Sequence, residues 1–146
     1  MNTDDLFDRL SEKPLWVVDP MPARVPEDKG AHWFALEDIW RGGPERARFF
    51  ARLGRILQKL NCYYDFLVQD GEETYENPAP AALAARVERL AQSDGDWLNI
   101  FLDGGSALVA MRGDELTMAV YNPDERSRAL LEKLAAGEGL FFWRSE

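Results

Sequence analysis

Three apolar runs near the C-terminal end place the strongest constraint on the fold. They are WLNIFL (97–102), SALVAMR (106–112) and LTMAVY (116–121), and the short segments DGG and GDE separate them. Gly and Asp in such segments are typical of tight turns. Short apolar runs bounded by turn residues indicate strands, and short connections place consecutive strands side by side. The sequence therefore predicts a three-strand antiparallel meander.

Four further segments have the composition of strands, namely residues 15–18, 62–69, 74–76 and 139–143. The second and third flank an Asp-Gly pair, which predicts a hairpin. The segment HWFALEDIW (32–40) fits either a strand or a helix, and Gly42, Gly43 and Pro44 end it in both cases.

Helices are predicted from caps and from the spacing of apolar residues. Asn2 or Thr3 caps a first helix, and Pro14 stops it. The clearest helix starts at Glu45, with Pro44 acceptable at the first helical position, because apolar side chains recur at helical spacing as far as Leu60.

A short motif occurs twice, in TYENPAP (74–80) and VYNPDE (120–125). We expect Asn77 and Asn122 to cap two further helices whose first residues are the prolines that follow. Gly137 is expected to end the last helix in the left-handed conformation. The repeat is therefore interpreted as a strand-to-helix junction, and an ancestral duplication of a hairpin-plus-helix unit is compatible with it.

These elements predict one α+β domain over residues 1–146. The expected architecture is an antiparallel sheet of about five or six strands that includes the meander, with two or three helices packed on one face. A chain of 146 residues with 46% apolar residues is long and apolar enough to bury a core of its own.

The residue types exclude several chemistries. His32 is the only histidine and Cys62 the only cysteine, so a zinc site and an intrachain disulfide are both excluded. Ser106 lacks the Gly-x-Ser-x-Gly frame of a nucleophile elbow. The GGP segment at 42–44 lacks the fingerprints of phosphate-binding loops and is a weak anion site. We therefore expect a protein that is not an enzyme and that needs no cofactor or metal.

The charge balance bears on the partner. The formal net charge of −9 disfavours nucleic acid and anionic membranes. The N-terminus carries three acids where a signal peptide would be basic and apolar, and no later run reaches the roughly 20 apolar residues of a membrane span. These features predict a cytoplasmic protein.

Acidic residues gather in the predicted turns, where they could contact a basic partner. A solvated acidic tip is favoured over a calcium or magnesium site at residues 70–76, because the calcium-loop frame is missing. In size, charge and lack of catalytic groups the chain resembles bacterial immunity or inhibitor proteins, which implies a protein partner such as a toxin. The predicted contact residues are Asp70, Glu72, Glu73, Glu76, Asp94, Asp96, Asp103 and Asp114.

Two alternative functions remain open. Arg48, Arg52, Arg55 and Lys59 form a basic stripe along one side of the predicted helix, and with Tyr63 or Tyr64 this stripe could bind a small acidic ligand or serve an enzyme. Neighbouring acids could also simply neutralise it. In the second alternative, the C-terminal strand is an edge strand that pairs with a second copy in a homodimer.

Overall fold

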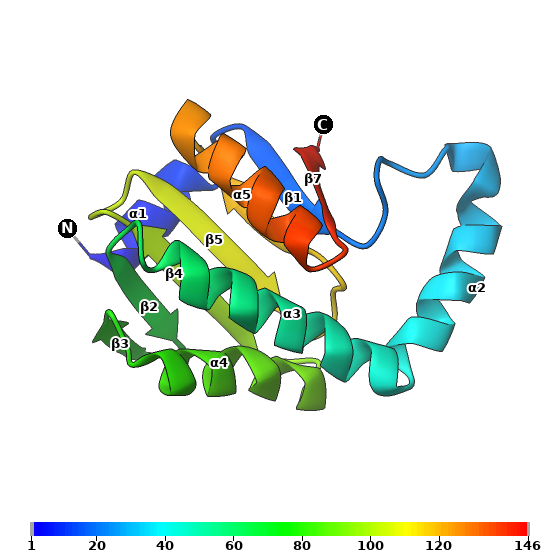
Figure 1. The fold of residues 1–146 in the computed structure, drawn as a ribbon, viewed down its shortest axis with the longest axis horizontal. Helices are drawn as coiled ribbons and strands as arrows, with labels where there is room; N and C mark the ends of the chain where they lie inside the picture. The colour runs from blue at the N-terminus through cyan, green and yellow to red at the C-terminus, as the bar shows by residue number, and fades with distance from the viewer. Residues whose placement is uncertain (1, 146) are drawn as a thin grey trace.

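A computed structural model describes residues 2–145 and shows an α+β fold with a seven-stranded sheet (Figure 1). The helices are α1 (Thr3–Leu10), α2 (Gly30–Arg41), α3 (Pro44–Leu60), α4 (Pro80–Arg89) and α5 (Glu125–Gly137), with short 3-10 helices η1 (Glu27–Lys29) and η2 (Leu90–Gln92). The strands are β1 (Leu15–Asp19), β2 (Phe66–Asp70), β3 (Glu73–Glu76), β4 (Trp97–Leu102), β5 (Ala107–Arg112), β6 (Met118–Tyr121) and β7 (Phe141–Arg144).

The strands follow the order β3-β2-β4-β5-β6-β1-β7, and every neighbouring pair is antiparallel. The predicted meander is confirmed as β4-β5-β6. The predicted count of five or six strands is too low by at least one. All seven segments with the composition of strands join the one sheet, in which β3 and β7 are short edge strands with hydrogen bonds to one neighbour only. Strand β1 lies between β6 and β7, so Val18 pairs with Met118 across the sheet.

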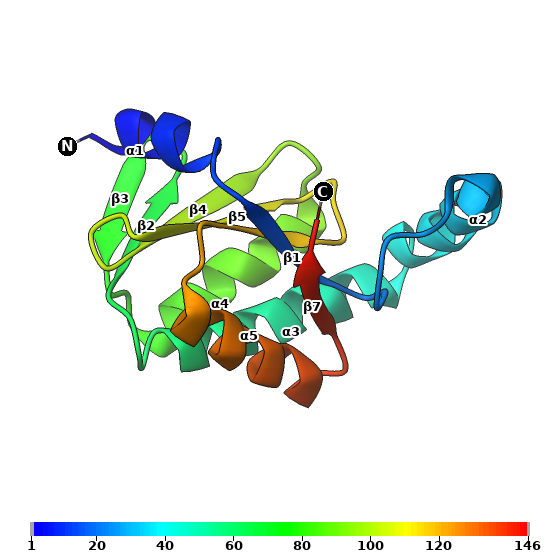
Figure 2. The same ribbon diagram turned by 90° about the horizontal axis from the view of Figure 1, so that it is seen from above.

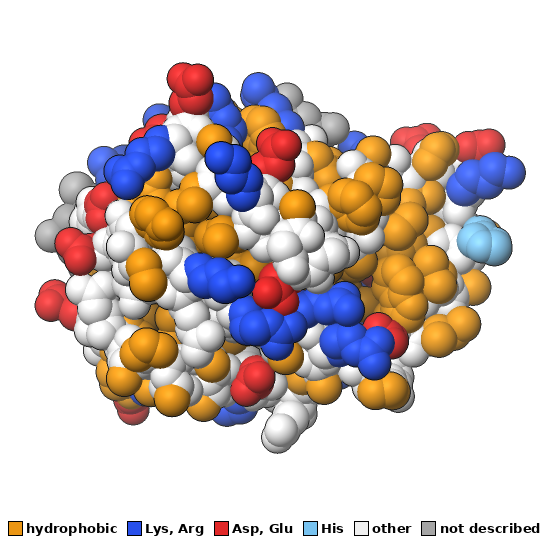
Figure 3. Space-filling model, in the orientation of Figure 1, with side chains coloured by type: hydrophobic (Ala, Val, Ile, Leu, Met, Phe, Trp, Pro, Cys, Tyr) orange, Lys and Arg blue, Asp and Glu red, His pale blue; other side chains and the backbone are white. Residues whose placement is uncertain are grey.

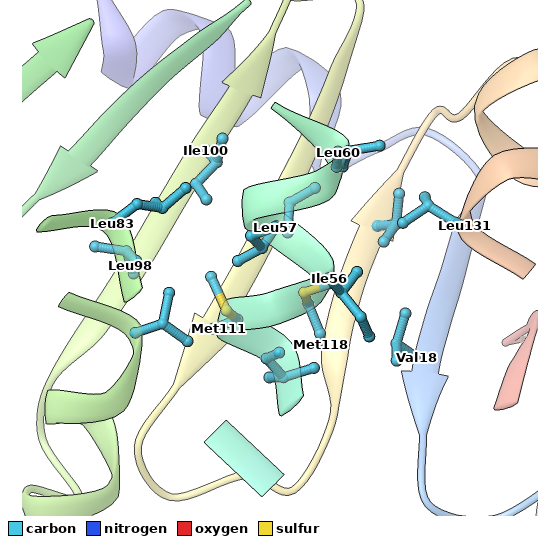
Figure 4. Close-up of a cluster of buried hydrophobic side chains, with 14 of the residues drawn as sticks. Val18, Ile56, Leu57, Leu60, Leu83, Leu98, Ile100, Met111, Met118 and Leu131 are labelled. Carbon is cyan, nitrogen blue, oxygen red and sulfur yellow. The ribbon is translucent and has the colours of Figure 1, made fainter. Parts of the chain in front are cut away.

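Helices α3, α4 and α5 cover one face of the sheet (Figures 1 and 2). Ile56 and Leu57 of α3 are fully buried at the centre of this layer, with Leu83 of α4 and Leu131 of α5 nearby (Figure 4). Burying each such side chain contributes about 1.5–3 kcal/mol, so this layer provides most of the hydrophobic stabilisation. The helices pack closely because Gly54 of α3 lies against Ala84 of α4.

Helix α1 lies on the opposite face of the sheet (Figure 2). Asn2 caps it by accepting a hydrogen bond from the Asp5 amide at 2.8 Å, which confirms one of the two predicted caps. Leu6 and Leu10 pack on Phe101 and Leu108 in a second, smaller cluster. Helix α1 is short and covers only part of this face of the sheet.

The Tyr-Asn-Pro junctions differ from the expectation. Asn77 and Asn122 do not cap the following helices, since α4 begins at Pro80 and Asp124 caps α5 by accepting from the Ser127 amide at 2.8 Å. Both asparagines instead have positive φ, 41° and 61°. Asparagine tolerates this left-handed conformation because its side chain forms hydrogen bonds with nearby backbone. The repeat therefore marks a left-handed turn after a strand.

The end of α5 also differs by two residues. Gly139, with φ 74°, holds the left-handed position that was predicted for Gly137. The amides of Gly139 and Leu140 donate to Ala136 and Ala135, which is the bonding pattern of a Schellman motif.

Candidate functional site

Helix α2 projects from the body of the protein as an arm (Figures 1 and 2). We call residues Gly30–Arg41 the arm. None of its twelve residues is buried, and Phe34 and Ile39 are 64% and 70% exposed. An isolated helix of this length is marginal in water, so the arm depends on the contacts that its side chains make.

Two tryptophans attach the arm to the body. The rings of Trp33 and Trp40 meet edge to face, with centroids 6.0 Å apart and planes at 80°. At seven residues apart they share one side of the helix with Leu36. Trp40 packs against the main core. Figure 3 shows a broad apolar surface over the arm and the adjoining part of the body.

A groove separates the arm from the helical layer. We call it the arm groove; it has a volume of about 200 Å³. Trp40, Phe49, Leu116 and Leu140 give it apolar walls. Its two charged residues are Arg52 and Glu45, and Glu45 is paired with Arg48. Such a surface can accommodate an apolar side chain of another molecule with a negative group beside it.

A second hollow, of about 260 Å³, lies between the arm and the sheet. It contains Asp19, Trp33, Glu37 and Arg41, and Glu37 forms an ion pair with Arg41 at 3.3 Å. Burial raises the pKa of the Asp19 carboxyl to about 6, and the nearby charge of Glu37 adds to this shift. Hydrogen bonding from the Met21 amide, 2.8 Å from Asp19 Oδ2, acts in the opposite direction.

We call this second hollow the Asp19 hollow; its carboxyl has a pKa shifted well above the ordinary value. A carboxyl with a pKa near 6 can exchange a proton close to neutral pH. However, Asp19 Oδ2 already accepts the Met21 amide in a local turn at the end of β1. This contact makes Asp19 part of the joint between the sheet and the loop that leads to the arm.

The basic stripe lies along α3 and ends beside the arm, as the band of Lys and Arg in Figure 3 shows. Arg48 pairs with Glu45 at 2.6 Å, and Arg55 and Lys59 share Glu138 at 2.7 and 3.8 Å. Within the described chain, Arg52 has no ion pair. Four cations therefore face two acids, and the uncompensated cation is the one in the arm groove.

The two tyrosines considered with the stripe have different surroundings. Tyr63 is 54% exposed, whereas Tyr64 is 7% exposed and belongs to the core. Burial raises the pKa of the Tyr64 hydroxyl. Tyr64 is therefore a packing residue.

The structure separates the predicted acidic contact residues into two groups. Antiparallel pairing places Asp103 and Glu76 at one end of the sheet, since Leu102 pairs with Phe66 and Glu76 with Leu67. The other six come together at the opposite end, which we call the acidic end: Asp70, Glu72, Glu73, Asp94, Asp96 and Asp114.

Arginines neutralise much of the acidic end. Asp70 accepts from Arg86 and Arg89 at 2.7 Å, and Asp114 pairs with Arg112 at 3.0 Å. Glu72 and Asp96 have no ion pair within residues 2–145. The acidic end is therefore not uniformly negative, because ion pairs with arginines neutralise several of its carboxylates.

Arg46 links three segments at this end of the sheet. Its Nη2 lies 2.7 Å from Asp94 Oδ1, and it donates to the carbonyls of Gly113 and Leu90 at 2.7 and 3.3 Å. Asp94 and Asp114 also share a hollow with Asp38 and Arg41 of the arm. The base of the arm is thus built against the acidic end.

The remaining candidate residues are scattered. His32 lies exposed on the arm and Cys62 is an exposed free thiol. Residues 2–145 hold no cluster of three or more His, Cys, Asp or Glu suited to a metal ion. The same residues include no helix that is both long and apolar enough to span a membrane.

Comparisons of the chain with protein-family models, curated proteins and solved structures gave no match.

Sequence reasoning missed the arm as a surface. The apolar pattern of residues 32–40 fits both a strand and a helix. Whether another element buries this segment depends on the tertiary structure, which the pattern does not predict. A usable signal was present, because a proline-rich loop precedes the segment and Gly42 and Gly43 follow it. Helix-breaking residues on both sides are compatible with a helix that is separate from its neighbours and leaves the body.

Proposed function

We propose that this chain is a non-catalytic protein-binding module whose contact surface is the arm together with the arm groove. One observation carries the proposal: a twelve-residue helix with no buried residue presents Phe34, Ile39 and two half-buried tryptophans. Contiguous exposed apolar surface is uncommon on proteins that act alone. Aromatic side chains are also the residues most enriched at binding hot spots.

The charge around the arm groove indicates the chemistry of the partner. Arg52 lines the groove and has no ion pair in the described chain, since the one acid of the lining, Glu45, pairs with Arg48. Arg55 lies one turn further along α3. An arginine fork binds a carboxylate in two parallel hydrogen bonds. The proposed ligand is therefore a protein segment with apolar anchors for the groove and a carboxylate for Arg52.

Site-specific photo-crosslinking in the source cells tests this proposal. A photoreactive phenylalanine analogue replaces Ile39, which is 70% exposed, and the matched control carries it at Ala129, an exposed position on α5. We expect one adduct with a different protein from position 39 and none from position 129. Arg52→Glu should lower the yield by about fivefold or more, because charge reversal at an interface opposes binding.

Three results would contradict the proposal. Equal labelling from both positions would show that the contact is not specific to the arm. If the yield of the adduct did not change with Arg52→Glu, the arm groove would not be part of the contact surface. An adduct of twice the chain mass of 16.6 kDa would make the arm a contact between two copies.

A second candidate function is inhibition of a basic enzyme or toxin through the acidic end. The clustering of six predicted acids at one end of the sheet favours it. The net charge of −9 would accelerate encounter with a basic active site. In that case charge reversal at Glu72, Glu73 and Asp96 would slow association, and substitutions on the arm would have no effect.

Homodimer formation through the C-terminal strand remains a proposal as well. Strand β7 is an edge strand, bonded only to β1, and Phe141 is 43% exposed on it. Edge strands can pair with another chain. A mass of 16.6 kDa by light scattering at high protein concentration would exclude this pairing.

A further inference from the structure

Helix α1 covers only part of its face of the sheet (Figure 2). A cavity of about 510 Å³ lies on this face. Its floor is a row of residues paired across four adjacent strands. Gln69 pairs with Asn99, Asn99 with Ala110, and Ala110 with Ala119. The cavity exists because the positions on β5 and β6, Ala110 and Ala119, carry only methyl groups, where larger side chains would fill the space.

Two carboxamides form the polar part of this floor. Gln69 and Asn99 are only 9% and 8% exposed, and Asn99 Nδ2 donates to Gln69 Oε1 at 3.3 Å. This bond leaves Gln69 Nε2 and Asn99 Oδ1 without a hydrogen-bond partner in residues 2–145. Neither atom is sealed from solvent, unlike the unpaired Arg46 Nε and Tyr64 hydroxyl. The cavity therefore contains a free donor and a free acceptor side by side.

Aromatic side chains stand at the rim. Phe7 of α1 and Trp97 of β4 are 37% and 38% exposed, and Tyr121 also lines the cavity. Small-ligand sites typically combine apolar and aromatic walls with a few convergent polar groups in a volume of roughly 300–1,000 Å³. This cavity has that construction.

The charges of the lining select against anions. Asp4 and Glu115 are in the lining, and the one cation there, Arg112, is already engaged by Asp114 and Glu115 at 3.0 and 3.7 Å. A phosphate or carboxylate would meet no free positive group in the lining. The ligand that fits is uncharged, planar and provided with an adjacent donor and acceptor.

We propose that this cavity binds an uncharged nucleobase or nucleoside, held by the Gln69–Asn99 pair and flanked by Phe7 and Trp97. An adenine edge offers a donor and an acceptor next to each other, which is why one carboxamide can pair with it in two bonds. In this cavity Asn99 Oδ1 would accept from that edge and Gln69 Nε2 would donate to it. Aromatic side chains stack on base faces. The site is independent of the arm, which is a separate helix that does not line this cavity.

Titration with adenosine, followed by calorimetry and by the fluorescence of Trp97 against a Trp97→Phe control, tests the assignment. We expect dissociation constants of roughly 10–100 µM for a ligand of this size. AMP should bind at least tenfold more weakly because of its phosphate. N6,N6-dimethyladenosine, which lacks the donor, should also bind at least tenfold more weakly.

Two variants separate the site from general effects. Asn99→Leu removes the free acceptor, and Ala119→Leu fills the floor without touching the amides; each should weaken adenosine binding at least tenfold. Ala129→Leu on the exposed side of α5 is the matched control and should have no effect. Unchanged far-ultraviolet circular dichroism establishes that the variants are folded.

The proposal is overturned if adenosine and uridine both fail to bind the folded wild-type protein. It is also overturned if Asn99→Leu and Ala119→Leu bind adenosine as the wild type does. Binding of an acetylated tripeptide amide with no binding of adenosine would assign the cavity to a peptide and would equally overturn the proposal.

Discussion

The Trp33 and Trp40 rings, both on the arm, meet edge to face with centroids 6.0 Å apart on the side of the arm that faces the body. Trp40 packs on the main core and Trp33 faces the Asp19 hollow. The pair therefore supports the arm from the side that faces the body and leaves Phe34 and Ile39 exposed.

Trp40→Ala is expected to loosen the arm and spare most of the domain. Amide exchange across residues 34–41 should accelerate strongly, and the free energy of unfolding should fall by about 1–2 kcal/mol because Trp40 is only half-buried. Ile39→Ala, on the same helix and 70% exposed, is the control and should change stability by less than about 0.5 kcal/mol. Hydrogen-exchange mass spectrometry makes the comparison, and equal effects of the two variants would contradict it.

Asp19 makes stability depend on pH in a defined direction. Its folded pKa of about 6 lies above the unfolded value of 3.8, so the folded state binds the proton more tightly and this contribution is lost as pH rises from about 4 to 6. Partial exposure limits the effect to about 1–2 kcal/mol. The groups that face Asp19 are Glu37, Arg41 and Glu115.

Asp19→Asn keeps an acceptor for the Met21 amide and removes the titration. Relative to the wild type, the variant should be equally stable near pH 4 and more stable by about 1–2 kcal/mol at pH 7.5. Urea unfolding at the two pH values measures this. A stability difference that does not change with pH would show that Asp19 titrates normally.

Arg46 should matter far more than its neighbours on α3. Its side chain is 18% exposed and bonded to Asp94, Gly113 and Leu90. Arg46→Met keeps the stem but leaves these acceptors without their donor, which should cost about 2–3 kcal/mol. Arg48→Met is the matched control, because Arg48 is 54% exposed and pairs only with Glu45; its cost should be below about 0.5 kcal/mol. Thermal or urea unfolding measures the stability of both variants. Similar losses of stability would show that the contacts of Arg46 do not stabilise this end of the sheet.

The two left-handed asparagines predict a particular order of substitutions. At Asn122, with φ 61°, glycine should be more stable than alanine by about 1 kcal/mol, because only glycine adopts this conformation without a steric cost. The same order is expected at Asn77. If alanine is as stable as glycine at both positions, as judged by urea unfolding, the conformational interpretation of the repeat is wrong.

Local signals in the sequence predicted the local features of the fold well. Asn2 as a cap, Pro44 at the first position of α3 and the β4-β5-β6 meander all depend on residues close together in the chain. The sequence predicts the caps of α4 and α5 two residues too early, because asparagine favours both helix caps and left-handed turns. The pattern alone did not separate these two uses.

Features that depend on distant residues could not be predicted. The position of β1 between β6 and β7 pairs residues about 100 positions apart, as Val18 and Met118 show. The acidic turns were recognised, but their arginine partners come from α3, α4 and β5. The cavity on the sheet requires Gln69, Asn99 and Ala119 to meet across strands, which follows only from the register.

The most direct test of the central claim is the dissociation constant of the partner captured at position 39, measured with purified proteins. We compare Phe34→Asp/Ile39→Asp on the arm with Glu72→Lys/Asp96→Lys at the acidic end, since none of these four residues is buried. If the arm is the contact surface, the arm variant should bind at least about 100-fold more weakly, and the acidic-end variant should stay within about threefold of the wild type. Unchanged binding by the arm variant together with a large loss in the acidic-end variant would contradict the claim.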